Sequence, residues 1–257
     1  MNCVIIAQVL AVAEAELRKL RHDPVELFTR IVQPILWLVI FGQVMSRVNA
    51  IPTGGIPYLD FLAPGILAQS VMFIAIFYGL SAIWERDAGV LTKYLVSPTP
   101  RWALVLGKAL GSGFRSLSQA IVILVLTLLM EVDLRLAFSA VAALLGFVVL
   151  GSAVFSTFSL IIACLVKTRE RFMGIGQLLT MPLFFASNAI YPVTLMPPWL
   201  TAIARINPLS YLVDALRTLM LSGSSSVFGL GMDLGVLSTF ALVFIFIAAK
   251  LYPTILR

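Results

Sequence analysis

The chain has 257 residues, of which 60% are hydrophobic and only 12% are charged, and its mean hydropathy is +1.03. An ordinary soluble domain carries about 25% charged residues. A water-soluble fold of this size also has too few interior positions to hide so much apolar surface. The composition therefore excludes an ordinary soluble protein and favours a chain that lies in a membrane.

Charge-free runs divide the chain into segments close to the length that a bilayer requires. They cover residues 31–46, 61–84, 116–130, 136–166, 172–204 and 234–249. A helix crosses the hydrocarbon core with about 20 apolar residues, and neighbouring basic side chains extend a short run by snorkelling. Residues 1–257 are thus predicted to form one all-α integral membrane domain with six membrane-spanning helices. These are expected over residues 26–48, 58–84, 102–130, 136–166, 172–190 and 229–250.

The lysines and arginines predict the orientation of these helices, because basic residues accumulate on the cytoplasmic side. One side would hold Arg18, Lys19, Arg21, Arg30, Arg86, Lys93, Arg101, Lys108, Lys167, Arg169, Arg171, Lys250 and Arg257. The other side would hold only Arg47, Arg135, Arg205 and Arg217. Both termini are therefore predicted to be cytoplasmic. The net charge of +6 is explained by this topology, so no nucleic-acid partner is expected.

The N-terminal segment, residues 1–24, has an apolar stripe at helical spacing. Ile6, Leu10, Ala13, Leu17 and Leu20 recur every three to four residues. This pattern is typical of an amphipathic helix that lies on the inner membrane surface, in contact with lipids. A signal peptide is the alternative, but no positively charged region precedes the apolar stretch.

The segment of residues 85–101, on the predicted inner side, is amphipathic and ends at prolines. Ala88, Leu91, Tyr94 and Leu95 fall on one helical face, and Pro98 ends the helix. One interpretation is a plain connector that rests on lipid headgroups. The other is a docking helix, residues 85–98, that carries force from a soluble partner.

The segment of residues 191–217, on the predicted outer side, is apolar despite four prolines. Irregular backbone at membrane depth is tolerated only where protein buries it or where it lines a cavity. Two interpretations stay open: a pair of short interfacial helices that cap the bundle, or re-entrant helices, residues 192–217, that cover an exit pathway. The residues that define the pattern are Pro192, Pro197, Trp199, Asn207, Pro208 and Tyr211.

The sequence lacks the residues that would make the chain an enzyme or its own energy source. It has no G-x-x-x-x-G-K-[ST] phosphate loop, and His22 is its only histidine, so no ATP site, metal site or catalytic residue is predicted. An ion-coupled carrier usually has a buried acid or a broken helix at mid-membrane, repeated in two halves. Neither is evident, so energy is expected to come from a partner.

Four stretches together resemble a known family. They are QPILWLVIFG at residues 33–42, YLDFLAPGILAQS at residues 58–70, ERDAGVLTKYLVSPTPRWALVLGK at residues 85–108, and YPVTLMPPWLTAIARINPLSYLVDALR at residues 191–217. With them, the chain resembles the type-2 ABC exporter permeases, the membrane subunits of drug, lipid and polysaccharide exporters. The daunorubicin-resistance type is the most similar.

This resemblance implies a homodimer of permeases with two copies of a separate ATP-binding subunit, which would hold ATP and Mg, in a bacterial plasma (inner) membrane. It implies outward transport of a hydrophobic or amphipathic substrate (drug, lipid or lipid-linked glycan) by alternating access. It also implies coupling through Glu85, Arg86, Gly89, Lys93 and Tyr94, so Glu85→Ala is predicted to uncouple the protein without unfolding it. The substrate path is expected near Gln33, Phe41, Phe184, Ser187 and Asn188. The alternatives are an ion-coupled or channel-type transporter without an ATPase partner, and a membrane-anchored assembly factor.

Overall fold

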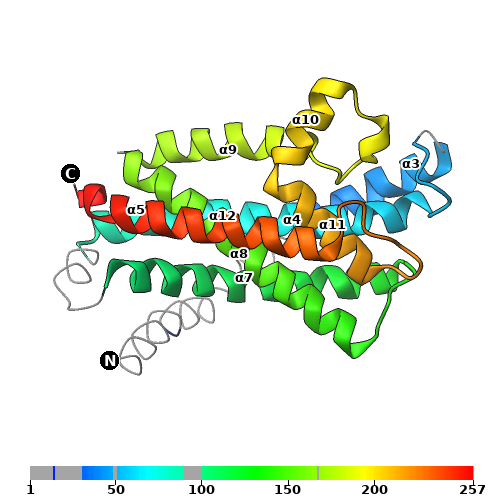
Figure 1. The fold of residues 1–257 in the computed structure, drawn as a ribbon, viewed down its shortest axis with the longest axis horizontal. Helices are drawn as coiled ribbons and strands as arrows, with labels where there is room; N and C mark the ends of the chain where they lie inside the picture. The colour runs from blue at the N-terminus through cyan, green and yellow to red at the C-terminus, as the bar shows by residue number, and fades with distance from the viewer. Residues whose placement is uncertain (1–13, 15–30, 49–50, 90–99, 167, 257) are drawn as a thin grey trace.

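The computed structural model describes residue 14 and residues 31–48, 51–89, 100–166 and 168–256. In this part of the chain, helices are the only regular elements apart from one isolated bridge between Leu134 and Leu221. The helices pack side by side into an elongated bundle (Figure 1). The predicted all-α class is therefore confirmed for the described residues.

Five helical runs are long and apolar enough to cross a membrane: Ile31–Val48, Tyr58–Asp87, Arg101–Leu129, Phe138–Leu165 and Leu230–Ile255. The chain is therefore a multi-pass membrane protein. The remaining predicted span, the fifth in chain order, corresponds to α9, Arg169–Phe185, which has 17 residues. At 1.5 Å per residue this helix is about 26 Å long, shorter than a hydrocarbon core of about 30 Å. The six-span arrangement thus remains a prediction.

The first span changes its helical type along its length. A π-helix, η1, covers Leu36–Gly42 and is followed by α3, Gln43–Val48. Pro34 precedes η1 and has no N–H to donate, which favours a local change in helical pitch. One side of this span is exposed, including Val32, Ile40 and Val44.

The second span forms the centre of the bundle. It consists of α4, Tyr58–Tyr78, and α5, Leu80–Asp87, which are joined at Gly79. α4 packs against α8, α7 and α11 as well as the first span. Two glycines permit this packing, because a Cβ at Gly65 would lie 2.4 Å from the Ala189 carbonyl oxygen and a Cβ at Gly79 would lie 2.0 Å from Ser159 Oγ.

The next two spans, α7 (Arg101–Leu129) and α8 (Phe138–Leu165), are joined through buried hydroxyls. The Ser152 hydroxyl lies 2.8 Å from that of Ser112 and 3.0 Å from that of Ser116. Small residues let two helices approach closely, and hydroxyl pairs stabilise the contact in an apolar medium. These serines therefore have a structural role.

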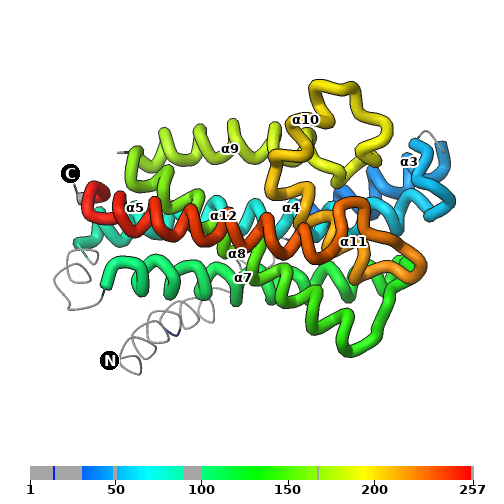
Figure 2. Tube along the Cα trace, viewed as in Figure 1, coloured from blue at the N-terminus to red at the C-terminus, as the bar shows by residue number. Residues whose placement is uncertain are grey.

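Between α9 and the last span, the chain forms three short helices. η2, Val193–Leu195, is followed by α10, Pro198–Ile206, and α11, Pro208–Met220. α10 stands at the periphery, whereas α11 lies against α4, α8 and α12 (Leu230–Leu251). Figure 2 shows the yellow trace of this segment arching away from the bundle before α11 returns to it.

The segments expected on opposite sides of the membrane lie at opposite ends of the bundle. α5, the beginning of α9 and the end of α12 lie at one end, and α3, α10 and α11 lie toward the other (Figure 1). We call these the inner and outer ends, after the predicted orientation. α9 ends at Phe185 rather than just before Tyr191, because residues 186–191 form a buried turn.

Candidate functional site

The inner end contains a buried ion pair that joins the second and third spans. The Lys108 ammonium of α7 lies 2.7 Å from the Glu85 carboxylate of α5, and both side chains are more than nine-tenths buried. Lys108 also lies over the Tyr78 ring, 5.9 Å from its centroid. The pair holds the end of α5 against the first turns of α7, and residues 88–100 connect these two helices.

A second, exposed ion-pair cluster joins α5 to α9. Asp87 accepts from Arg86 at 3.0 Å and pairs with Arg169 at 2.8 Å. The Arg169 guanidinium lies over the exposed Trp84 ring, 5.2 Å from its centroid. Together the two clusters connect α5 to α7 on one side and to α9 on the other.

The residues predicted to couple to a partner therefore have different surroundings. Glu85 and Arg86 lie in the last turn of α5, where Glu85 is buried by its pairing with Lys108. The chain turns at Gly89, whose φ of +71° is a conformation that favours glycine. Lys93 and Tyr94 lie outside the described residues, as does most of the predicted coupling helix and, apart from Glu14, the N-terminal amphipathic segment.

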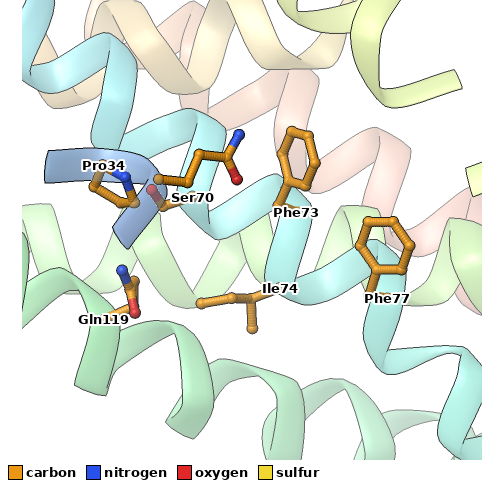
Figure 3. Close-up of a pocket in the computed structure, with 7 residues that line it drawn as sticks. Pro34, Ser70, Phe73, Ile74, Phe77 and Gln119 are labelled. Atoms are coloured by element: carbon orange, nitrogen blue, oxygen red, sulfur yellow. The ribbon is translucent and has the colours of Figure 1, made fainter. Parts of the chain in front are cut away.

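Gln33, predicted near the substrate path, lines a cavity of about 250 Å³. The first span also contributes Pro34, α4 contributes Ser70, Phe73, Ile74 and Phe77, and α7 contributes Gln119 (Figure 3). We call this space the Gln33 cavity. Its polar groups come from three helices that are far apart in the sequence, whereas its wider walls are apolar.

The other predicted path residues do not line the Gln33 cavity. Phe41 and Phe184 both pack edge-to-face on Trp37, at 4.9 and 5.5 Å between ring centroids, so that they join the first span to α9. Ser187 donates to the Phe184 carbonyl oxygen and accepts from the Ala189 N–H. Asn188 lines a different cavity at the outer end.

Asn207 connects α11 to α9 in the outer segment. Its carboxamide oxygen accepts from the Leu209 N–H at 3.0 Å, which caps α11. Its amide nitrogen donates to the carbonyl oxygen of Leu183 at 2.7 Å and to that of Ala186 at 3.2 Å. Asn207 therefore fixes the position of α11 against the end of α9.

The remaining predicted outer residues have local structural roles or are exposed. Pro192, Pro197 and Pro208 stand at the beginnings of η2, α10 and α11, where a proline loses no helical hydrogen bond. Tyr211 donates to the Arg205 carbonyl oxygen at 2.6 Å, whereas Trp199 is 66% exposed. These contacts favour an ordered outer cap, with α10 on its surface.

An apolar cavity of about 360 Å³ is lined by residues of α8, α10 and α12, together with Leu183, Asn207 and Pro208. Phe155, Phe158, Phe240 and Phe244 form most of its aromatic wall. A polar molecule in this cavity would lose hydrogen bonds to water without replacing them, whereas a hydrocarbon chain has none to lose. The cavity therefore fits a hydrocarbon chain better.

The structure also reveals residues that the sequence interpretation missed. Lys108, Asp87 and Arg169 complete the inner clusters, and Asp214 and Asp233 approach each other through Ser226 at the outer end. A lysine within an apolar run was a usable signal, because a buried ammonium requires a counter-charge. Among the described residues, no group of three or more His, Cys, Asp or Glu side chains could hold a metal ion.

Comparison with known proteins gives the class of this helical membrane protein. The model of the ABC-2 type transporter family matches residues 7–221, so the chain belongs to this family. It is 28% identical over 233 residues to the daunorubicin resistance ABC transporter permease protein DrrB1 of Streptomyces coeruleorubidus, covering 90% of this chain and 81% of that protein. It is 29% identical over 206 residues to the putative transport permease ycf38 of Cyanophora paradoxa, covering 78% and 70%. The inner membrane transport permease YadH of Escherichia coli K12 is 25% identical over 226 residues, covering 85% and 81%.

The predicted relationship to type-2 ABC permeases is therefore confirmed. The chain is a membrane subunit of an ABC transporter, and membership of the family implies an ATP-binding partner subunit.

Proposed function

We propose that this chain forms the transmembrane pathway of an ATP-driven exporter of hydrophobic or amphipathic molecules. The observation that carries the proposal is the buried Glu85–Lys108 pair at the base of the inner segment, in a chain of this family. The pair holds together the ends of two spans, and residues 88–100 connect those same ends. A force on this connection therefore reaches both spans.

The mechanism depends on how rigidly the inner end is built. α5 continues almost directly from α4, the central helix, and Asp87 ties its end to Arg169 of α9. Backbone hydrogen bonds resist bending of a helix, whereas a flexible linker would absorb the same displacement. ATP-driven movement of a partner docked on residues 85–98 would thus move α4, α7 and α9 together, opening the pathway alternately to each side.

The two cavities suit a substrate with an apolar body and a polar part. The apolar cavity has an aromatic wall, and the Gln33 cavity combines aromatic side chains with two glutamines and a serine. Binding sites for small molecules commonly combine apolar walls with a few polar groups that fix orientation. A drug, a lipid or a lipid-linked glycan has this character, and a daunorubicin-resistance permease is among the relatives.

The function is tested at Gly89, which turns the chain out of α5. A Cβ at this position would have no heavy atom of the described residues within 4 Å. Gly89→Val should strain the backbone by about 1–2 kcal/mol without creating a clash. The ATP-binding partner subunit should co-purify with the wild-type protein and much less with Gly89→Val. Gly89→Asn is the matched control, because asparagine tolerates positive φ. Equal co-purification of both variants, with unchanged ATPase stimulation, would leave residues 85–98 as a plain connector.

The first span and α9 are proposed to face a second copy of the chain, with the substrate path between the two copies. The two elements contact each other through Trp37, Phe41 and Phe184, and each exposes an apolar side, including Ile40 and Leu178. Cysteines at Ile40 and Leu178 should therefore crosslink between copies. A cysteine at Leu242, which is equally exposed on α12, serves as the control. Crosslinking through Leu242 alone would place the dimer interface elsewhere.

The chain is proposed to lie in a bacterial plasma (inner) membrane with both termini cytoplasmic and six spans. Glu170 lies in the first turn of α9 and Ser225 in the loop between α11 and α12, and both are exposed. The beginning of α9 and that loop lie at opposite ends of the bundle (Figure 1). In a variant without Cys3 and Cys164, a membrane-impermeant maleimide added to intact cells should label Ser225→Cys but not Glu170→Cys. After the cells are opened, both cysteines should react. Labelling of Glu170→Cys in intact cells would reverse the orientation.

The ion-coupled alternative receives some support from the buried Asp214 and Asp233. However, Asp214 accepts hydrogen bonds from the N–H groups of Val227 and Phe228 and from the Ser226 hydroxyl, which satisfy the carboxylate locally. Both acids lie at the outer end, away from mid-membrane. The pair is better explained as a support for the loop before α12.

A further inference from the structure

The outer end contains a cavity of about 340 Å³ that none of the functions above uses. It lies between the loop before α4, the turn after α9, the end of α11 and the loop before α12. Its lining includes Asn188 and Arg217, together with the hydroxyl-bearing residues Thr53, Thr194 and Ser224. We call it the outer polar cavity.

Arg217 brings a positive charge to this cavity from a buried position. Only 6% of the residue is exposed, and its guanidinium lies 3.8 Å from the centroid of the Phe61 ring. One terminal nitrogen donates to the carbonyl oxygens of Phe61 at 3.1 Å and Asn188 at 2.9 Å. These contacts hold the guanidinium in place without neutralising its charge.

Three polar atoms beside this charge lack a hydrogen-bond partner among the described residues. They are Arg217 Nε and both the oxygen and the nitrogen of the Asn188 carboxamide. Asn188 is only 1% exposed. A buried donor or acceptor left unsatisfied is costly, and native proteins leave few of them. Asn188 is nine-tenths buried and lines the cavity, so a ligand bound there can supply partners for its carboxamide.

The acid that acts electrostatically on Arg217 does not supply them. Asp214 interacts electrostatically with Arg217, but its carboxylate oxygens accept from the Ser226 hydroxyl and from the N–H groups of Val227 and Phe228. Asp233 faces Ser226 as well. The free groups of the cavity are therefore mainly donors beside a fixed cation, which is the donor set that binds phosphate and carboxylate oxygens.

We propose that the outer polar cavity binds an oxyanionic headgroup, a phosphate or a carboxylate, through Arg217 and Asn188. The Arg217 Nε–H and the Asn188 amide N–H groups donate to the anionic oxygens. The Asn188 carboxamide oxygen accepts from an O–H or N–H of the same ligand. The ligand is either the headgroup of a lipid in the outer leaflet or a soluble phosphate. This site goes beyond the proposed export function, and its occupancy is measured without transport.

Thermal unfolding of the purified full chain in a neutral detergent tests the proposal. The probes are short-chain phosphatidylglycerol, short-chain phosphatidylcholine and inorganic phosphate. At about ten times the dissociation constant, a bound probe should raise the unfolding midpoint by about 3–6 °C. A rise with phosphatidylglycerol alone identifies a lipid headgroup that carries a donor, and a rise with phosphate identifies a soluble ligand.

Asn188→Leu should abolish this rise while leaving the ligand-free protein at least as stable, because it removes two unsatisfied buried atoms. Asn188→Asp is the second variant: its carboxylate would accept from Arg217 and repel an anion, so the rise should again disappear. Arg205→Gln, an exposed outer arginine outside the cavity, should retain the rise. The proposal is overturned if no probe stabilises the wild-type protein, or if both Asn188 variants are stabilised as much as the wild type.

Discussion

Replacing Glu85 with alanine should lower the free energy of unfolding by about 3–5 kcal/mol, because the change leaves the Lys108 ammonium buried without its counter-charge. Both side chains of this pair are more than nine-tenths buried, and their charged atoms are 2.7 Å apart. Lys108→Ala should lower the free energy of unfolding by a similar amount, because it removes the other member of the same buried ion pair. Unfolding of the purified chain by chemical denaturant measures both.

A double replacement shows whether the loss of stability comes from breaking this ion pair or from any change at the inner end. Glu85→Gln combined with Lys108→Met removes both charges at similar volume, so it should recover most of the stability lost in either alanine variant. Asp87→Ala removes an exposed ion pair next in the chain and should cost less than about 1 kcal/mol. If Glu85→Ala costs no more than Asp87→Ala, the Glu85–Lys108 pair does not hold the inner end together.

This expected result changes the prediction made from the sequence, in which Glu85→Ala leaves the protein folded and only uncouples it. The structure places Glu85 inside the subunit, so its effect on coupling acts through the positions of α5 and α7. Of the predicted coupling residues that the structure describes, Arg86 and Gly89 are not buried. Loss of coupling without loss of stability is therefore expected at Gly89.

Replacing Gly65 with alanine should destabilise the protein by about 1–3 kcal/mol, because α4 touches the turn after α9 at this point. The added Cβ would lie 2.4 Å from the Ala189 carbonyl oxygen and 2.9 Å from the Ala189 carbonyl carbon. These are backbone atoms, so they cannot rotate away as a flexible side chain would. The displaced turn would also disturb Asn188, which directly precedes Ala189.

Gly146→Ala is the matched control, since it places the same methyl group on an exposed part of α8, with no heavy atom of the described residues within 4 Å. Alanine is a better helix former than glycine, so this variant should gain about 0.5–1 kcal/mol. The two substitutions are thus expected to have opposite signs in the same unfolding measurement. Destabilisation of similar size in both would show that the Gly65 contact is unimportant.

The sequence predicted the features that depend on local pattern. Apolar runs gave most of the spans to within a few residues. In the outer segment, whose pattern includes Pro197, Asn207 and Pro208, these residues lie at helix ends. The fifth span was predicted too long, because a charge-free run does not distinguish a helix from the buried turn of residues 186–191. Turn and helix are equally apolar here.

The contacts between distant residues could not be predicted. Lys108 and Glu85 are 23 positions apart, and Arg217 meets the Phe61 carbonyl oxygen across 156 positions. Pairings of this kind depend on how the helices pack, which hydropathy does not specify. The Gln33 cavity is a further example, because Gln33, Ser70 and Gln119 gave no signal that they would lie together.

Transport in inside-out proteoliposomes tests the central claim most directly. They would contain this chain and its ATP-binding partner subunit, with a fluorescent amphipathic lipid analogue or dye outside. The probe should accumulate inside only with hydrolysable ATP, irrespective of ionophores, and Gly89→Val should abolish accumulation. Accumulation driven by an imposed ion gradient without ATP, with no response to the ATP-binding subunit, would contradict an ATP-driven exporter.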